Sequence, residues 1–557
     1  MEWVQVYNPL SNALLSTIAA ALPIVILLFT LAILEWAAYR AALAGLLAAV
    51  SISIWIYGMP ARAATAAAVN GIAYGLFPIG WIVLNAVFLY DLTVATGTFE
   101  IVKSSVAHLS ADRRIQALLV AFSFGAFIEG ASGFGTPVAI CSALLIGLGF
   151  SPVYAAALSL LANTAPVAFG AIGTPILTLA AITGLPAHQL TAMAGRQLTP
   201  ISLLIPVWLV VMMSGWKGLR GVWPVALVSG GSFAVVQFFW SNYVGAELVN
   251  VIGGMVSLAC TVAFCSYWKP AVMHASAMAA GSTGSAAVPV RRATIRAWMP
   301  WLFLSLFVVL WGLAPVKALL GKGKLVAPSF DVPGLHRIVY RDYPVLPVPA
   351  DRSKLSDPGY KMKRAEEARF TVNWLSATGT GILFASIATA LYLRIKPRRV
   401  LSIAGKTLWR MRWSLATIAL MMSLGFITRY GGTDATLGLA FTHTGFLYPF
   451  FAALLGWLGV ALTGSDTSSN VLFGSLQKIT AQQLGLNPVL ITAANSTGGV
   501  MGKMIDAQSI VVATASTGQT GGEGKILRML FWHSLALAGI MGVIVMLQAY
   551  VFPWMIP

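Results

Sequence analysis

The sequence predicts an all-α polytopic membrane protein with about twelve full transmembrane helices and two re-entrant hairpins in an inverted repeat. Three observations predict this class. Of 557 residues, 58% are hydrophobic and only 9% are charged, whereas a soluble domain carries about 25% charged residues. Apolar runs of membrane-spanning length recur along the chain, and two conspicuously polar stretches interrupt them.

The apolar runs are long enough to cross about 30 Å of hydrocarbon. The run at 13–34 has no basic segment before it and no cleavage site, so we interpret it as a retained span and not as a signal peptide. Twelve full spans are expected, near residues 14–34, 41–57, 70–90, 152–184, 197–215, 222–241, 245–268, 297–315, 371–393, 413–427, 489–513 and 529–552.

Two polar stretches, FIEGASGFGTP at 127–137 and TGSDTSSN at 463–470, lie between pairs of shorter apolar arms. Each pair predicts a re-entrant hairpin, because non-helical backbone at membrane depth is tolerated where protein or a water-filled cavity covers it. The arms are 115–128 with 134–150, and 444–463 with 471–486.

The distribution of charge predicts the orientation. With an extracytoplasmic N-terminus, the inside loops hold 19 Lys and Arg and the short outside loops hold three, as the positive-inside rule requires. Both termini are then extracytoplasmic. The exception is the outside loop 316–370, with 11 Lys and Arg against six Asp and Glu. Its prolines and mixed charge favour a solvated loop over an external cap. The net charge of +18 thus reports topology and contact with membrane lipid, not nucleic-acid binding.

Hairpin, turn and polar-interrupted span occur twice in the same order. Gly130 precedes Asn163 by 33 residues, Gly464 precedes Asn495 by 31, and each Asn is followed seven residues later by glycine. In the predicted topology the first hairpin opens to the inside and the second to the outside. This arrangement is the inverted repeat typical of secondary transporters.

The interruptions have the chemistry of an anion site. A helix that breaks near the midplane leaves N–H groups without partners, and their partial positive charge suits a carboxylate. The following spans are interrupted as well, at LLANTAP (160–166) and AANSTGG (493–499). Four such tips would form a pocket for a small anion with a polar substituent. Small-residue helix packing explains Gly133, Gly135 and Gly170 equally well, but it does not explain TGSDTSSN.

Two acids are the candidates for proton coupling. A carboxylate at the bilayer centre costs at least about 2.5–3.5 kcal/mol, so it is usually functional or paired. Asp466 and Glu129 lie at the two hairpin tips, where a buried acid can take up a proton together with the anion. Lys503 and Asp506 are three residues apart on one helical face and are expected to form a charge pair.

Enzyme and cofactor motifs are missing from the sequence. AGKT at 404–407 resembles the end of a Walker A loop, but Val400 occupies the position of the first glycine. The chain contains no GxGxxG, HExxH or CxxCH, and its three cysteines have no metal spacing. We therefore expect a carrier driven by a gradient, with no cofactor other than a co-transported proton.

Three stretches carry a family resemblance: FIEGASGFGTPVAI (127–140), LTGSDTSSNVLFGSLQ (462–477) and NSTGGVMGKMIDAQSI (495–510). They resemble the signature stretches of the L-lactate permease family, which includes the glycolate permeases and belongs to the ion transporter group. The resemblance implies proton-coupled symport of L-lactate, and often D-lactate and glycolate, across the bacterial plasma membrane. By analogy, an elevator movement of the hairpin domain is expected.

The resemblance also implies site residues, with Glu129 and Asp466 among them. Many family members are expected to have Ser-Pro where this chain has Asp506 and Ala507, which affects the expected coupling and substrate range. To the implied set we add Asn163 and Thr164 from the first interrupted span. The predicted substrate-binding residues are Ser132, Gly133, Thr136, Asn163, Thr164, Ser465, Thr467, Ser468, Ser469, Asn470, Asn495, Ser496 and Thr497.

Other interpretations stay open at this level. A sodium-coupled or dicarboxylate carrier of the same architecture is the main alternative; a dicarboxylate needs two cationic partners, and only Lys503 and Arg429 lie near the tips. A membrane enzyme and a passive channel are further alternatives. The expected division is 1–114 scaffold spans, 115–196 transport domain, 197–315 scaffold with inside loop 269–296, 316–370 extracytoplasmic loop, 371–443 scaffold with basic inside loop 394–412, 444–513 transport domain and 514–557 C-terminal span.

Overall fold

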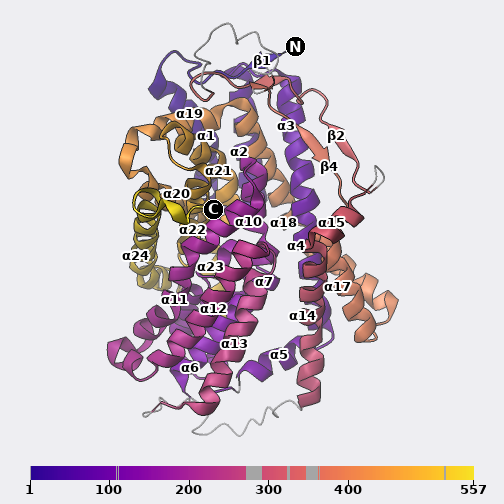
Figure 1. Ribbon diagram of the computed structural model, residues 1–557, viewed down its shortest axis with the longest axis vertical. Helices are drawn as coiled ribbons and strands as arrows, with labels where there is room; N and C mark the ends of the chain where they lie inside the picture. Colours follow the sequence, from indigo (N-terminus) through magenta and orange to yellow (C-terminus); the bar gives the residue numbers. More distant parts are fainter. Residues whose placement is uncertain are drawn as a thin grey trace.

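The computed structural model describes residues 2–557 except 35, 108, 111, 134, 271–290, 323–325, 347–361, 363 and 520–521. Most of the predicted inside loop and part of the predicted extracytoplasmic loop therefore lie outside the described residues. Within the described chain, 11 helices are long and apolar enough to cross a membrane, or 12 if one bent pair counts as a single span. The helices form an elongated bundle (Figure 1). The predicted all-α polytopic class is confirmed.

One group of helices packs around the long helix α18. Helices α2, α3 and α4 contact α18 directly, and α1 packs on α2. We call α1 to α4 with α18 the α18 group. Gly71 and Gly75 allow the close approach, because a Cβ on either would meet the backbone of Ser423 or Ala419. The bounds are α1 Ala13–Ala32, α2 Ala38–Trp55, α3 Ala61–Tyr74, the π-helix η1 Gly75–Gly80, α4 Trp81–Ala95 and α18 Pro397–Gly431.

The first hairpin unit comprises residues 113–183. Its hairpin is followed by a span that bends by 67° between Pro152–Ala162 and Val167–Thr183. Three long helices follow it and pack in sequence, α11 on α12 and α12 on α13. The bounds are α6 Arg113–Ala117, η2 Leu118–Phe124, α7 Gly125–Ala131, α8 Thr136–Gly147, α9 Pro152–Ala162, η3 Val167–Phe169, α10 Gly170–Thr183, α11 Ala187–Arg220, α12 Trp223–Tyr243 and α13 Val249–Tyr267.

The second hairpin unit comprises residues 448–516 and has the same order of elements. Its arms α20 and α21 pack on the interrupted span that follows, and α24 covers that span from outside. The bounds are α19 Thr433–Phe441, η6 Thr442–Leu447, α20 Tyr448–Thr463, α21 Asp466–Gln483, α22 Pro488–Gly502, α23 Ala507–Ser516, α24 Glu523–Tyr550 and η7 Pro553–Met555.

The two hairpins enter the bundle from opposite ends. At the open end of the first, Arg113 donates to Gly149 O at 3.2 Å, near α6 at the bottom of Figure 1. At the open end of the second, Gln483 donates to Pro344 O at 2.9 Å, in the segment that pairs with the N-terminal strand at the top. This placement agrees with the expected inversion, while a symmetry relation between the two units stays a prediction.

The segment after α15 (Ala314–Leu320) lies over the same end of the bundle as the N-terminus (Figure 1). Strand β1 pairs in parallel with β3, and β2 pairs antiparallel with β4. The expectation of a merely solvated loop is wrong for the described part of 316–370, because Leu335 and Val339 are fully buried against the α18 group. The bounds are β1 Trp3–Val4, β2 Ser329–Asp331, β3 Val339–Tyr340 and β4 Arg369–Thr371.

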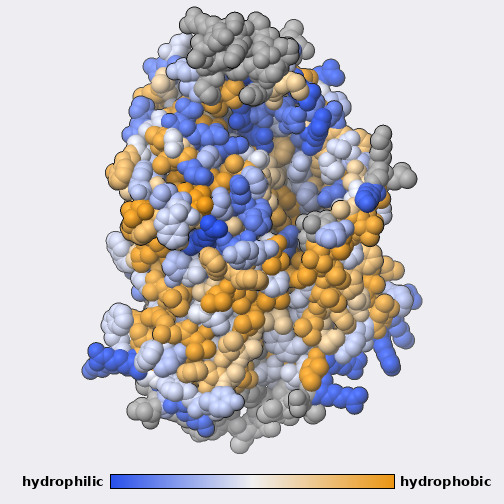
Figure 2. All heavy atoms as spheres, viewed as in Figure 1, coloured by the Kyte–Doolittle hydropathy of each residue, from blue (hydrophilic) through white to orange (hydrophobic). Residues whose placement is uncertain are grey.

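The remaining helices form one edge of the bundle, where α14 packs on α5 and α17. In Figure 2, hydrophobic residues dominate a band across the middle and lower half of the visible face, and hydrophilic residues gather toward its two ends. That pattern is the one expected of a protein that lies across a bilayer. The bounds are α5 Thr98–Ala107, α14 Arg291–Gly312, α15 Ala314–Leu320 and α17 Thr378–Tyr392.

Candidate functional site

A cavity of about 280 Å³ lies where both hairpin units meet the middle of α18. Its wall contains both hairpin tips, both breaks in the following spans, and one face of α18. The predicted convergence of four tips on one pocket therefore agrees with the geometry of the described chain. The predicted site residues that line the cavity are Glu129, Gly133, Ser465, Asp466, Thr467, Ser468 and Lys503.

The first tip is a turn made of glycine. Between α7 and α8, Gly133 and Gly135 have φ values of 60° and 77°, a left-handed conformation that glycine adopts without steric cost. Both line the cavity. Ser132, by contrast, donates back to Ile128 O at 3.1 Å and does not reach the cavity wall. Thr136 begins α8 and also lies outside the wall. The first tip thus presents backbone to the cavity.

Glu129 is the acid of the first tip. It is 4% exposed and lines the cavity. Its Oε1 lies so close to Gly170 that a Cβ at that position would collide with it. Its Oε2 has no hydrogen-bond partner within the described residues. A buried carboxyl group with an unfilled oxygen is suited to gain or lose a proton as a ligand arrives.

The break in the first unit has strained backbone. Ala171 and Ile172 have φ values of 43° and 58°, and each non-glycine residue in this region costs about 1–2 kcal/mol. Gly170 and Ala171 line the cavity. Asn163 and Thr164, which the sequence analysis proposed as ligand-binding residues, are buried behind this break and are not part of the cavity wall.

The second tip presents a helix N-terminus to the cavity. Gly464 ends α20 with a φ of 72°, and Ser465 caps α21 by accepting from Ser468 N at 3.2 Å. Ser465, Thr467 and Ser468 are half-buried and line the cavity. Since α21 has 18 residues, its first-turn N–H groups and its dipole favour an anion at this place.

Asp466, the acid of the second tip, is held by a polar network. Its Oδ2 accepts from Ser496 Oγ at 2.5 Å and from Asn470 Nδ2 at 3.5 Å. Asn495 donates in turn to Asn470 Oδ1 at 2.9 Å. All three partners are fully buried and none lines the cavity. Their place in the structure is that of positioning residues for Asp466. Asp466 Oδ1 has no partner in the described chain.

Two further predicted residues face neighbouring helices. Ser469 donates to Gly456 O on α20 at 3.2 Å. Thr497 donates to Gln197 on α11 at 2.7 Å. Both are fully buried and neither is part of the cavity wall. They connect the second unit internally and to α11.

The break in the second unit carries charge. Lys503 donates to Gly464 O at 2.6 Å and forms an ion pair with Asp506 at 3.3 Å. Asp506 Oδ1 also accepts from Ser509 N at 2.8 Å, so it caps α23. Serine caps a helix about as well as aspartate. Asp506, which stands where Ser is expected in many family members, therefore still caps α23 and also provides an ion-pair partner for Lys503.

Comparison with known proteins agrees with these observations. A family model described as L-lactate permease matches residues 16–552. The chain belongs to the L-lactate permease family. Glycolate permease GlcA of Escherichia coli strain K12 is 44% identical over 574 residues, and the match covers 100% of both chains. The L-lactate permeases of Escherichia coli strain K12 and Bacillus subtilis strain 168 are 43% and 42% identical, also over 100% of both chains.

Among solved structures, the YdaH transporter of Alcanivorax borkumensis matches with a TM-score of 0.46 and 14% identity, covering 88% of this chain and 89% of that one. Members of the L-lactate permease family are transport proteins and not enzymes. With its 11 or 12 candidate spans in the described chain, this member is a multi-pass membrane protein, and the side on which its termini lie stays a prediction.

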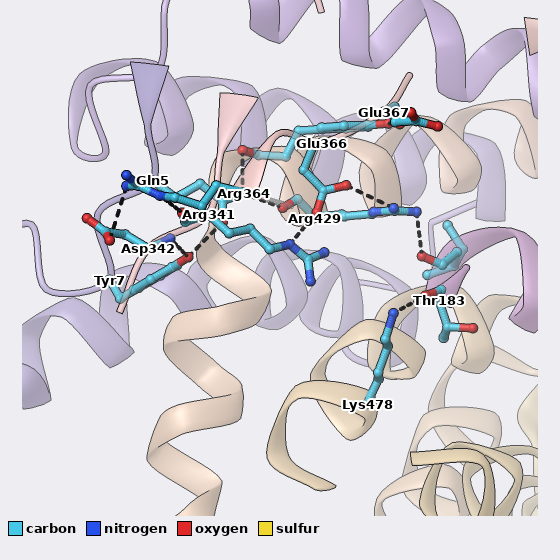
Figure 3. Close-up of polar contacts among 12 residues, drawn as sticks. Gln5, Tyr7, Thr183, Arg341, Asp342, Arg364, Glu366, Glu367, Arg429 and Lys478 are labelled. Carbon is cyan, nitrogen blue, oxygen red and sulfur yellow. Dashed lines mark hydrogen bonds and ion pairs between the residues drawn. The ribbon is translucent and has the colours of Figure 1, made fainter. Parts of the chain in front are cut away.

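This permease also has a buried ion cluster beyond the cavity (Figure 3). Arg429, in the last turn of α18, donates to Glu366 at 3.0 Å and to Ile182 O at 3.1 Å. Arg341 forms a second ion pair with Glu366. Lys478 of α21 donates to Thr183 O at 2.6 Å. Arg429, which the sequence analysis placed near the tips, is thus engaged at the end of the bundle.

The electrostatics of this cluster are strongly attractive. Glu366 is largely buried, which opposes its ionisation, but the guanidinium groups of Arg429 and Arg341 outweigh burial and lower the pKa of Glu366 to about 2. Arg429 lies seven residues beyond Met422 of the cavity wall, or about 10 Å along the helix. The cluster lies at the end of the bundle where the N-terminal strand pairs with β3.

Some residues of the wall were missed by the sequence analysis. Ser414, Thr417, Met421 and Met422 come from α18, inside a span that looked ordinary because hydroxyl and thioether side chains are common in membrane helices. Gln508 stands within one of the signature stretches, two residues after Asp506, and was given no role from the sequence. An amide next to the Lys503 pair was the signal that could have identified it.

Proposed function

We propose that this permease carries L-lactate and related 2-hydroxymonocarboxylates, including D-lactate and glycolate, across the bacterial plasma membrane in symport with protons. The names of its full-length relatives support this substrate class. The cavity volume of about 280 Å³ is just below the usual range for ligand sites, about 300–1,000 Å³, and suits an acid of two or three carbons.

The observation that carries proton coupling is the charge balance at the cavity. Among the described residues, Glu129, Asp466 and the Lys503–Asp506 pair bring three carboxyl groups together with a single ammonium group. Two like charges about 4 Å apart repel by about 4 kcal/mol at an effective dielectric constant of 20. An incoming carboxylate therefore binds well only after a proton neutralises at least one of these acids.

In this proposal the substrate carboxylate binds at the N-terminus of α21, beside the Lys503 ammonium group. Protonation of Asp466 or Glu129 accompanies its entry, and the neutral load then crosses with little charge to desolvate. The two hairpin units would move together against the α18 group in an elevator-type step. That step would require Arg429 on α18 to release the Ile182 carbonyl of α10.

The decisive experiment is uptake of labelled L-lactate by the purified protein in liposomes, under an imposed pH gradient, with and without sodium. Accumulation that follows the pH gradient and is unaffected by sodium is expected. Excess unlabelled glycolate should compete and succinate should not. Sodium-dependent uptake, or competition by succinate, would replace this proposal with a sodium-coupled or dicarboxylate carrier.

A further inference from the structure

Among the described residues, the cavity wall contains one amide side chain, that of Gln508 on the first turn of α23. The residue is exposed, although Asp506 and Ser509 on either side of it are buried. Within the described part of the chain its side chain takes part in no hydrogen bond. A carboxamide offers both a donor and an acceptor, so this group is free to bind something inside the cavity.

Several other polar groups of the wall are already engaged. Thr463 donates to Gly459 O at 2.7 Å, and Thr174 donates to Ala171 O at 2.5 Å. Ser465 Oγ accepts from Ser468 N. The hydroxyls of the first turn of α21 lie beside the N–H groups that the proposed function assigns to the carboxylate. Gln508 reaches the second tip from α23, next to Gly464.

Gly464 fixes the position of Gln508 relative to Lys503. A Cβ added to Gly464 would lie 3.0 Å from Gln508 Cδ and 3.1 Å from its Oε1. The Lys503 ammonium group meets the same glycine at its carbonyl oxygen. The amide and the ammonium group therefore both lie next to one residue of the second tip, with Asp506 Oδ1 beside the amide, and both groups line the same cavity.

A 2-hydroxy acid has a matching arrangement, since its carboxylate and its hydroxyl are on adjacent carbons. A hydroxyl group both donates and accepts hydrogen bonds. A carboxamide can accept from it and donate to it, whereas an ammonium group can only donate. A site built to hydrogen-bond a substrate hydroxyl rejects the analogue that lacks it, because its polar groups then lose their water without gaining a partner.

We propose that Gln508 is a specificity-determining residue that binds the 2-hydroxyl group of the substrate while its carboxylate occupies the Lys503 side of the second tip. This inference rests on the proposed function, which names a site for the carboxylate of the substrate but none for its hydroxyl group. It makes Gln508 the part of the cavity that distinguishes lactate from propionate and glycolate from acetate.

The test compares Gln508→Met with the unmodified protein in liposomes under the same pH gradient. KM for labelled L-lactate and the inhibition constant of unlabelled propionate are measured in both. The variant should raise KM for L-lactate about threefold to tenfold, the cost of one uncharged hydrogen bond, and leave the inhibition constant of propionate unchanged. Gln508→Asn, which withdraws the amide by one methylene group, should lose the same preference.

Gln482→Met is the matched control, because Gln482 lies near the end of α21 and outside the cavity wall. It should leave both constants unchanged. Equal shifts for L-lactate and propionate in Gln508→Met, or no shift for either, would overturn the role of Gln508 while lactate transport stands. Failure of the unmodified protein to accumulate lactate would overturn the proposed function itself, and this assignment with it.

Discussion

The two hairpin units contribute different chemistry to one cavity. The first presents backbone: two left-handed glycines at its tip and left-handed residues at its break, with Glu129 as its ionisable group in the wall. The second presents side chains: the Ser465 cap, Asp466, and Lys503 at its break. A repeated architecture therefore does not imply a repeated role. In the proposed function, the shape of the cavity comes mainly from the first unit, and recognition of the substrate mainly from the second.

The units agree in how each places its acid. Glu129 Oε1 lies against Gly170, and Asp466 Oδ1 lies 2.5 Å from where a Cβ of Gly499 would be. In both cases a glycine in the interrupted span makes room for a carboxyl group of the hairpin tip. Asp466 also has side-chain donors, from Ser496 and Asn470. The two acids are about equally buried, so they differ in their hydrogen-bond partners and not in burial.

The largest expected effect is that of Asp466→Asn. If the second unit carries the coupled proton, the variant should abolish accumulation driven by the pH gradient and retain exchange of internal for external lactate, because the anion site itself persists. Uptake and counterflow in the same liposomes measure both. If Asp466→Asn accumulates lactate as well as the unmodified protein does, the coupled proton would be assigned to Glu129 of the first unit. Glu129→Gln should then abolish accumulation.

A smaller loss is expected from Gly170→Ala in the first unit. The added methyl group collides with Glu129, and overpacking of this kind costs about 1–3 kcal/mol. Thermal unfolding in detergent and lactate uptake should both show the loss. Gly147→Ala on α8 is the control, because no atom of a neighbouring group lies within 4 Å of the place that its methyl group would take. Equal behaviour of the two variants would mean that the Glu129 side chain moves aside freely.

A pH-dependent effect is expected where both units meet the ion cluster. The folded-state pKa of Glu366, about 2, lies below its ordinary value of 4.5. A lowered pKa adds stability above pH 4.5 that is lost as the pH falls toward 2. Glu366→Gln should therefore lower the unfolding temperature at about pH 6, and the difference from the unmodified protein should shrink between about pH 5 and pH 3.

Glu367→Gln provides the comparison for that measurement, because Glu367 is exposed and pairs with Arg337 at the surface. Exposed ion pairs contribute little to stability, so its unfolding temperature should follow that of the unmodified protein. A Glu366→Gln difference that stays constant over the same pH range would contradict the ionised cluster.

The smallest effect is expected for the difference between Asp506→Ser and Asp506→Ala. Both variants lose the ion pair with Lys503, but serine retains the cap on α23, so Asp506→Ser should be more stable than Asp506→Ala by about 1 kcal/mol. Both variants remove a carboxylate from Lys503 and should strengthen lactate binding, because the ammonium group is then unopposed. Weaker binding in both would show that Asp506 is needed to orient Lys503.

The tips and the acids could be predicted from the sequence because local chemistry determines them. Glycine runs, Ser465 before a helical segment and carboxylates between apolar arms each have a local interpretation. The direction in which each side chain points could not be assigned. Asn470 stands in the same motif as Thr467 and Ser468, yet only the last two line the cavity. Asn495 and Ser496, from AANSTGG, also lie outside the wall. A shift of one residue on a helix changes the face by about 100°, so only the packed structure decides.

Contacts between residues far apart in the chain could not be predicted from the sequence either. Asp434 lies between the predicted span 413–427 and the predicted arm 444–463, yet it is 2% exposed in the first turn of α19. Glu366 lies in a stretch that looks solvated in the sequence, and its partners Arg341 and Arg429 are distant in the chain. No periodicity or motif connects such positions, because the ion cluster exists only when the segment folds back over the bundle.

The α18 side of the cavity has a consequence for substrate range. Met421 and Met422 form part of that wall, and methionine is an unbranched, polarizable side chain that adapts to irregular shapes. A wall of this kind can adapt to a substrate with one methyl group more or fewer. In the proposed function, chain length at the apolar end of the substrate is thereby weakly constrained, and one carrier would accept both two-carbon and three-carbon hydroxy acids.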